Sequence, residues 1–357
     1  MGLKKIPSGQ YLKDHLSPDE KLRYSRQILL EHIGTKGQIN IRNSSVVIIG
    51  TGATGCAHAL FLTRLGIGSL TIIDRDIVDL SNLPRQVLFT ENDVGRSKVE
   101  AAREHLTKIN EHVSITAITD DVNADNILTL VEGHDLILDG TDNLQTRYLI
   151  NDVSYQLGIP WIYTGAVSTQ AMTLTIDPRR DGACFRCLFP DPASPGTLMT
   201  CDTAGVLGTI PTIISGMAIN EAIKVLINPE SVKQDLLVME FWTNDFMKLK
   251  ATKQDNCPTC HHHRFDFLSQ HGRKDTITLC GRNAVQVNPP IRTDLDLELI
   301  ASHLEKVGTV NHEKGILTFS PDGNGIEIIL FSNGRAIIKG VEDEGRARAI
   351  YARYIAI

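Results

Sequence analysis

The chain has 357 residues, of which 42% are hydrophobic and 22% charged, and its net charge is −6 at pH 7. This length favours two domains, and the composition is that of a folded globular protein rather than a disordered chain or a small disulfide-bonded scaffold. The acidic balance argues against nucleic-acid binding, which usually needs a basic excess. The sequence shows neither an apolar run of about 18 residues nor a signal-like start, so we expect a cytoplasmic protein without membrane contact.

The first elements of the chain are an arm and a helix. Residues 1–16 have no clear periodicity and are expected to form an N-terminal arm. Ser17 and Glu20 then fit a capping box, in which each side chain bonds the other residue's backbone N–H. This pattern predicts a helix that continues through Leu29 and carries Arg26.

A strand, a glycine turn and a helix come next. The β-branched run Val46–Ile49 is typical of a parallel strand buried on both faces. The glycine turn follows at residues 50–55, then a helix to Leu65 and a second strand at Leu70–Asp74, which together form a βαβ unit. The alternation continues with expected helices at 98–109 and 143–157 and strands at 113–117, 136–139, 161–164 and 171–176. This order predicts an α/β fold with a doubly wound, mostly parallel, Rossmann-like sheet.

The second half of the chain has a different pattern. Residues 189–202 contain three prolines and a glycine, which predicts an irregular, mobile loop before a buried helix at 210–226. The larger domain is expected to span residues 17–270. Residues 271–357 are predicted to form a small α+β domain, whose clearest signal is a hairpin at Asn333–Gly334.

The glycine turn indicates a nucleotide site. Gly50, Gly52 and Gly55 open a helix directly after a strand, where backbone N–H groups and the positive helix end attract phosphate. Asp74 follows the next strand, where a carboxylate can accept hydrogen bonds from ribose hydroxyls. The alternative is that the three glycines serve only tight packing. A P-loop motif does not occur in the sequence.

Polar residues after the strands separate two kinds of chemistry. Asn82, Arg85 and Lys98 would supply an amide and two cations near the phosphates. Nucleotidyl transfer needs such cations because negative charge grows on the transferred group, whereas hydride transfer does not. Asp142 follows another strand and is placed to hold Mg²⁺ against phosphate oxygens. Its alternative role is to cap the helix that begins at Asn143.

Five of the seven cysteines are candidates for metal binding or reactivity. Cys184 with Cys187, and Cys257 with Cys260, form two Cys-x-x-Cys pairs. Four thiolates can close a tetrahedral structural zinc site, and neither pair opens a thioredoxin-like helix, so a redox role is disfavoured. Cys201 stands at the end of the expected loop. As an exposed thiol at a helix start it could be a reactive thiolate, and as a packed residue it could be inert.

Together these motifs resemble the ThiF/MoeB/HesA family, bacterial relatives of the ubiquitin-activating enzymes, over about residues 17–262. The resemblance is carried in order by Arg23–Gln27, the glycine turn, Asp74 with Asp76, Leu80–Gln86, Gly95–Lys98, Thr141–Asn143 and the two cysteine pairs. It implies an ATP-dependent adenylyltransferase that activates the C-terminal glycine of a ubiquitin-like sulfur carrier. The products would be the carrier acyl-adenylate and pyrophosphate.

The resemblance also implies roles for individual residues. Asp74 would bind the ribose, Asn82, Arg85 and Lys98 would hold the triphosphate, and Asp142 would bind Mg²⁺. The glycine turn would receive phosphate oxygens. The carrier carboxylate is already a nucleophile, so this reaction needs positioning and charge neutralisation rather than a general base.

Two further features of the resemblance concern assembly and the loop. Arg26 is similar to the arginine that reaches the other subunit's phosphates across a homodimer. Residues 189–202 are similar to the crossover loop that covers the carrier tail. Cys201 matches a loop cysteine that forms a covalent link to the carrier in some members and is dispensable in others.

The carrier could be ThiS, of thiamin thiazole synthesis, or MoaD, of molybdopterin synthesis. Residues 202–205 and the tail segments 279–286 and 334–340 resemble Bacillus-type ThiF proteins, which favours ThiS and leaves a MoeB-type role as the alternative. A rhodanese-like tail is not evident, so sulfur would come from a separate donor such as a cysteine desulfurase. A NAD-dependent oxidoreductase and a non-catalytic carrier-binding scaffold are more remote alternatives. The sequence indicates no role for residues 271–357.

Overall fold

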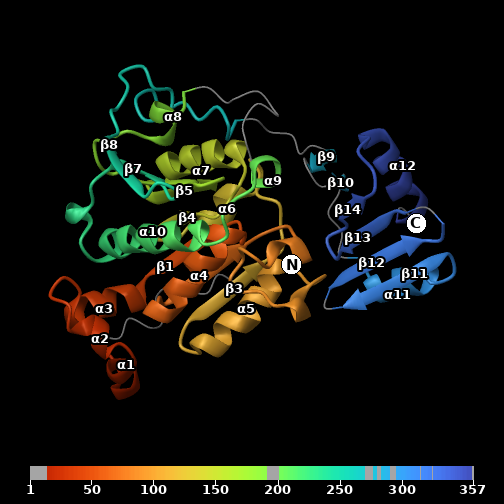
Figure 1. Ribbon diagram of the computed structural model, residues 1–357, viewed down its shortest axis with the longest axis horizontal. Helices are drawn as coiled ribbons and strands as arrows, with labels where there is room; N and C mark the ends of the chain where they lie inside the picture. Colours follow the sequence, from red (N-terminus) through yellow and green to blue (C-terminus); the bar gives the residue numbers. More distant parts are fainter. Residues whose placement is uncertain are drawn as a thin grey trace. The chain divides into compact units, whose positions relative to one another are not determined.

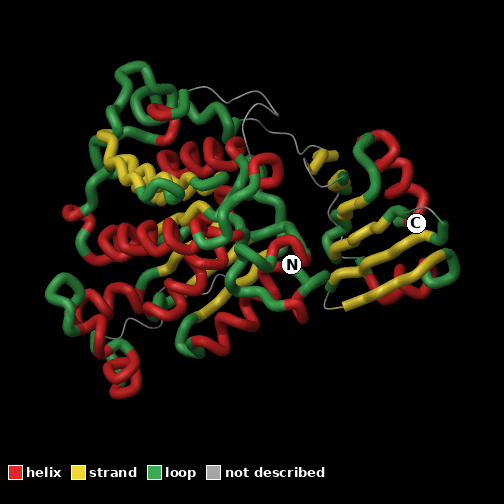
Figure 2. Tube along the Cα trace, viewed as in Figure 1, coloured by secondary structure: helices red, strands yellow, loops and turns green. Residues whose placement is uncertain are grey.

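The computed structural model of the chain divides into two compact units, Met1–Gln270 and His271–Ile357, each with its own hydrophobic core. Figures 1 and 2 show their helices and strands. The residues that the structure describes are 14–190, 201–269, 276–279, 283–289, 295–313, 315–323 and 325–355.

An eight-stranded sheet forms the centre of the first unit, in the order β3-β2-β1-β4-β5-β6-β7-β8. Its strands are β1 (Ser45–Ile49), β2 (Ser69–Ile73), β3 (Ser114–Ile118), β4 (Leu136–Asp139), β5 (Trp161–Val167), β6 (Gln170–Ile176), β7 (Asp235–Glu240) and β8 (Asp245–Lys250). The first five strands in this order pair in parallel, whereas β6, β7 and β8 each pair antiparallel with the strand before them. The predicted doubly wound, mostly parallel sheet is therefore confirmed.

Helices cover both faces of this sheet (Figure 2). On one side lie α3 (Gly34–Asn43), α4 (Ala53–Leu65), α5 (Lys98–Ile109) and α10 (Ile210–Ile227), and on the other α6 (Ile127–Val131) and α7 (Leu144–Leu157). Along β1, Val46 and Ile48 face the first group, whereas Val47 and Ile49 face the second. Both sets are buried, which explains the unbroken β-branched run in this strand.

The N-terminal helix is broken in two, so the prediction of one continuous helix through Leu29 is wrong. The capping box is present, because the Ser17 hydroxyl accepts from the Glu20 N–H at the start of α1 (Pro18–Arg23). The chain then bends at Tyr24 before α2 (Ser25–Ile28). Tyr24 is buried, and its hydroxyl accepts a 2.8 Å hydrogen bond from Asn110 after α5. The bend therefore places this aromatic ring in the core.

Helix α10 differs from the expectation that no apolar run reaches the length of a membrane span. Among the helices described, it is the one whose length and apolar composition would allow it to cross a membrane. Its residues Ala218, Ala222 and Val225 are nevertheless packed in the same core as α4. Such packing is expected of an apolar helix in a protein core, as the sequence predicted for residues 210–226.

Short helices and one hairpin complete the first unit. The short helices are η1 (Leu80–Asn82), η2 (Glu91–Asp93), α8 (Phe185–Leu188), α9 (Cys201–Ala204) and η3 (Pro229–Ser231). The β7–β8 hairpin was not predicted, because every residue of β8 is exposed and the strand lacks a buried face that alternation could show.

In its described residues, the second unit is a six-stranded antiparallel sheet with two helices, consistent with the predicted α+β class. Its strands follow the order β11-β12-β13-β14-β10-β9. The elements are β9 (Thr276–Leu279), β10 (Ala284–Val287), α11 (Leu297–Leu304), β11 (Gly308–Glu313), β12 (Ile316–Pro321), β13 (Glu327–Phe331), β14 (Ala336–Lys339) and α12 (Glu344–Tyr354). Strands β13 and β14 pair antiparallel, and Gly334 between them has φ +81°, which confirms the hairpin.

Candidate functional site

Two glycine turns meet backbone to backbone at the carboxyl ends of β1 and β4. Gly50 has φ +88°, and a Cβ on Gly55 would lie 1.9 Å from the Gly50 carbonyl oxygen. A Cβ on Gly140, just after β4, would lie 2.1 Å from the same oxygen. Only glycine permits this approach. The contact brings the residues that follow β4 next to the turn that begins α4.

The start of α4 is open to an anion. Its first residue follows Gly52, and no side chain caps the helix. The first backbone N–H groups of a helix have no partner within the helix, and the helix dipole adds partial positive charge there. This is the arrangement that binds phosphate in nucleotide sites.

Asp74 lies beside this helix start and is held by backbone groups. One carboxylate oxygen accepts from the Thr51 N–H at 2.6 Å, and the other accepts from the Asp76 N–H at 2.8 Å. A carboxylate offers about four acceptor positions, so two stay available to a ribose diol. The structure therefore brings Gly50, Gly52, Gly55 and Asp74 together, as the sequence suggested.

Lys98 is buried beneath the same region. Its Nζ lies 3.2 Å from an Asp76 carboxylate oxygen, and its side chain is 3% exposed. Burial raises the pKa of the neighbouring Cys56 thiol to about 12, while the charge on Lys98 opposes that rise and the charge on Asp74 adds to it. Lys98 is thus ion-paired with Asp76, and its charge acts on Cys56 in the helix that follows the glycine turn.

Asn82 and Arg85 lie in one turn after β2. The Asn82 side-chain oxygen accepts from the Asp79 N–H and so closes the η1 turn. Arg85 Nη1 donates to the Ser81 carbonyl at 2.7 Å. In this arrangement both residues stabilise their own turn.

Asp142 lies just past the second glycine turn, and the alternative role of helix cap is wrong. The Asn143 side chain caps α7 by accepting from the Gln145 N–H at 2.9 Å. Asp142 is exposed, and its charge acts on the guanidinium groups of Arg75 and Arg147. An exposed carboxylate beside a glycine turn is a suitable ligand for Mg²⁺, which usually takes one or two carboxylates and the substrate phosphates.

The sequence analysis missed two arginines near this edge of the sheet. Arg147 pairs with the fully buried Asp139 at 2.9 Å, and Arg75 pairs with Asp121 at 2.9 Å. Burial opposes the charge on Arg147, but Asp139 raises its pKa above the ordinary value for arginine. The available signal was an aspartate ending β4 with an arginine in the first turn of the next helix.

Arg26 lies far from the glycine turn of its own chain. Its neighbour Gln27 donates to the Leu65 carbonyl at the last turn of α4, and Arg23 donates to the Ile109 carbonyl at the end of α5. The 13 residues of α4 correspond to a length of about 20 Å. Arg26 is exposed at the opposite end of this helix from Gly52, so the chain does not bring it to its own site.

The predicted loop at residues 189–202 is largely outside the part of the chain that the structure describes, as is the Cys201 side chain. The backbone of α9, which begins at Cys201, lies against β5. After α9, the Gly205 carbonyl accepts from the Ser168 N–H, and the Leu207 N–H donates to the Ser168 carbonyl. Gly208 then approaches the Pro84 carbonyl. The chain thus returns beside the turn that carries Arg85.

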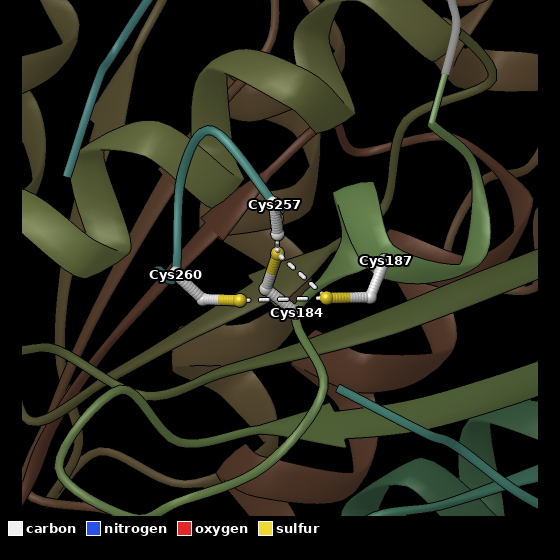
Figure 3. Close-up of side chains that lie close together, drawn as sticks. All are labelled: Cys184, Cys187, Cys257 and Cys260. Atoms are coloured by element: carbon white, nitrogen blue, oxygen red, sulfur yellow. Dashed lines mark hydrogen bonds between the residues drawn. The ribbon is translucent and has the colours of Figure 1, made fainter. Parts of the chain in front are cut away.

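Four cysteines form a buried cluster in the first unit. The Sγ atoms of Cys184, Cys187, Cys257 and Cys260 all lie within 4.8 Å of one another. Three of the separations are 3.4, 3.5 and 3.9 Å, and Figure 3 shows the sulfur atoms pointing toward a common centre. Tetrahedral zinc with bonds of about 2.3 Å needs sulfurs about 3.8 Å apart. The donor set and spacing therefore fit one zinc ion.

Helix α7 holds both cysteine segments. Asn151 accepts from the Phe185 N–H between the first pair, and Asp152 accepts from the Thr259 hydroxyl between the second pair. Asp152 also accepts from the Phe267 N–H. Burial raises the pKa of Asp152 to about 6, although these hydrogen bonds oppose the rise. Adjacent residues of one helix therefore orient the two halves of the cluster.

Comparisons with known proteins agree with this geometry. The model of the ThiF family matches residues 24–259. The chain is 37% identical over 337 residues to the sulfur carrier protein ThiS adenylyltransferase of Bacillus subtilis (strain 168), covering 93% of this chain and 99% of that protein. It is 38% identical over 247 residues to the adenylyltransferase and sulfurtransferase MOCS3 of Culex quinquefasciatus, covering 69% of this chain and 56% of that protein.

Among solved structures, the fold is similar to that of MccB from E. coli. The TM-score is 0.59 at 21% sequence identity, and the similarity covers 71% of this chain and 75% of that chain. At this identity the similarity concerns the fold alone.

We expect about one zinc ion per chain in the purified protein, measured by elemental analysis. Cys187→Ser should lose the zinc and lower the melting temperature, because three thiolates cannot close the tetrahedron. Cys56→Ser is the matched control, since Cys56 is equally buried but lies outside the cluster. That variant should keep its zinc. A metal-free wild-type protein with the same melting temperature as the zinc-loaded form would contradict a structural zinc site.

Proposed function

The chain belongs to the ThiF family, and we propose that it is an ATP-dependent adenylyltransferase that acts on a ubiquitin-like sulfur carrier protein. It would join AMP to the C-terminal glycine carboxylate of the carrier and release pyrophosphate. One observation carries the proposal. The uncapped start of α4 and the oriented carboxylate of Asp74 would form adjacent places for phosphate and ribose, and Lys98 is paired with Asp76, whose N–H bonds Asp74.

ThiS is the carrier that we favour, with MoaD as the alternative. The similarity to the Bacillus subtilis protein named for ThiS covers nearly the full length of both chains, including the second unit. The chain spans only about half of the MOCS3 relative. A NAD-dependent oxidoreductase finds no support in the relatives described above. The sulfur itself would come from a separate donor protein, such as a cysteine desulfurase.

Each of the site residues would contact a different part of the ATP–Mg²⁺ complex. Asp74 would accept from the ribose hydroxyls, and the N–H groups at the start of α4 would donate to phosphate oxygens. Asn82, Arg85 and Lys98 would hold the triphosphate, for which Lys98 would share its charge between Asp76 and a phosphate oxygen. Asp142 would bind Mg²⁺, which would neutralise negative charge on the phosphate oxygens. The carrier carboxylate attacks as it is, so no residue is needed to remove a proton.

We further propose that the active form is a homodimer in which Arg26 serves the partner subunit. Arg26 is exposed and lies about 20 Å from the glycine turn of its own chain, by the length of α4. An arginine so placed cannot act on phosphates bound there. A second copy could bring it to the other site.

Ala substitution of Arg85 or Lys98 should reduce carrier-dependent ATP–pyrophosphate exchange by about 10²-fold or more, the usual effect of removing one transition-state donor. Arg103→Ala on the exposed side of α5 is the control and should leave exchange unchanged. The measurement uses purified ThiS and, separately, MoaD. Exchange near the wild-type rate in both variants would remove these residues from the site, and failure with both carriers would contradict the proposed substrate class.

Mixing Arg26→Ala chains with Asp142→Ala chains should restore part of the exchange that each variant lacks alone. One site of the mixed dimer would then contain both residues. Size-exclusion chromatography with differently tagged chains verifies that mixed dimers form. Absence of any rescue in proven mixed dimers would show that Arg26 does not act across the interface.

Cys201→Ser should keep ATP–pyrophosphate exchange within a few-fold of the wild type, because no thiol attacks during adenylation. A thiol can act only when sulfur or the acyl group is passed on. If Cys201 is used there, the variant should lose a reducible or thioester-linked carrier adduct in intact-mass analysis and form thiocarboxylate more slowly. A normal thiocarboxylate yield would speak against a covalent role.

A further inference from the structure

We propose that Arg147 is a positioning residue for Asp142 and thereby sets the affinity of the site for Mg²⁺. This inference rests on the proposed function, in which Asp142 binds the metal ion. Arg147 lies in the first turn of α7. Among the residues that the structure describes, its hydrogen bonds go to Asp139, Thr141 and Thr164, and none goes to residues 50–55 or to α4.

The guanidinium of Arg147 joins three segments of the chain. Its Nε donates to an Asp139 carboxylate oxygen at 2.9 Å, and its Nη2 donates to the carbonyl oxygens of Thr141 at 2.6 Å and Thr164 at 3.3 Å. Its carbon Cζ lies 5.0 Å from the centre of the Tyr163 ring. The side chain is only 13% exposed. One planar cation therefore fixes the turn after β4 against β5.

The polar backbone and side-chain groups of Thr141 are all occupied. Its N–H and its hydroxyl both donate to Asp139, at 2.9 and 2.7 Å, while its carbonyl accepts from Arg147. The preceding Gly140 is fixed as well, because its N–H donates to the Ile49 carbonyl. Arg147 thus holds the carbonyl of the Thr141–Asp142 peptide, and Asp139 holds the preceding peptide through the Thr141 N–H.

The direction of the Asp142 carboxylate depends on this turn because, in the described part of the chain, the side chain itself is not held by hydrogen bonds to other groups. It is exposed and forms no hydrogen bond among the residues that the structure describes. Its direction is therefore set by the Thr141–Asp142 peptide plane and by attraction to Arg147 and Arg75. Mg²⁺ demands nearly ideal octahedral geometry, so a carboxylate that swings freely binds it less tightly. Loss of Arg147 should weaken Mg²⁺ binding without removing a metal ligand.

The test measures binding of ATP to the zinc-loaded full-length protein by isothermal titration, at a series of MgCl₂ concentrations. Arg147→Gln should raise the MgCl₂ concentration for half-maximal enhancement of ATP affinity by about tenfold, and leave ATP affinity without Mg²⁺ within twofold of the wild type. Arg147→Lys should be intermediate, because one ammonium cannot reach all three acceptors in the fixed geometry of the guanidinium. Asp142→Ala should abolish most of the enhancement, and adding Arg147→Gln to it should change nothing more.

Arg186 offers a matched control. Its Nη1 pairs with Asp266 at 2.8 Å, its side chain is 12% exposed, and it lies over the Phe267 ring. Arg186→Gln therefore loses a similar ion pair and should leave the MgCl₂ requirement within twofold. If Arg147→Gln does not fold by circular dichroism, the double variant Asp139→Asn with Arg147→Gln removes the unpaired buried carboxylate and carries the same test.

An unchanged MgCl₂ requirement in folded Arg147→Gln would overturn the inference. The same increase in the Asp142→Ala background would also overturn it, because Arg147 would then not act through Asp142. A wild-type protein that fails to bind ATP at any MgCl₂ concentration would contradict the proposed function itself. These outcomes separate a failure of this inference from a failure of the adenylyltransferase assignment.

Discussion

The close contact between the glycine turns after β1 and β4 is the constraint on which the site depends. A single methyl group on Gly55 or Gly140 would collide with the Gly50 carbonyl oxygen, so the two strands can end side by side only with glycine there. Two of the residues proposed to bind ATP and Mg²⁺ lie next to this contact. Asp74 bonds the first turn, and Asp142 follows the second. These residues lie at the carboxyl edge of the parallel strands, where ligands of open α/β sheets usually bind.

Helix α7 links this edge to the cysteine cluster. Its first turn carries Arg147, which holds the turn after β4, and its later turns carry Asn151 and Asp152, which orient the two cysteine pairs. The edge with the two glycine turns and the cysteine cluster are therefore both contacted by one helix of 14 residues.

The sequence allowed prediction of the elements that have one strong local signal. Residues Lys98–Ile109 were predicted at their observed bounds, and the β-branched run of β1, the glycine turn and the paired cysteines were also recognisable. Contacts between distant residues could not be seen in this way. The bend at Tyr24 depends on Asn110, and the Lys98–Asp76 pair depends on the contact between the start of α5 and the segment after β2. The distance of Arg26 from its own site likewise follows from tertiary structure and not from any motif.

The two cysteine pairs also shape the unfolded chain. Cys184 and Cys257 are 73 residues apart, and the segment between them contains α10 and the strands β7 and β8. A metal ion that joins the pairs closes this segment into a loop and removes conformational entropy from the denatured ensemble, as a covalent cross-link would. For a loop of this size the effect is on the order of 4 kcal/mol in the chain-entropy model. The edge hairpin β7–β8, whose outer strand is exposed along its whole length, lies within this segment.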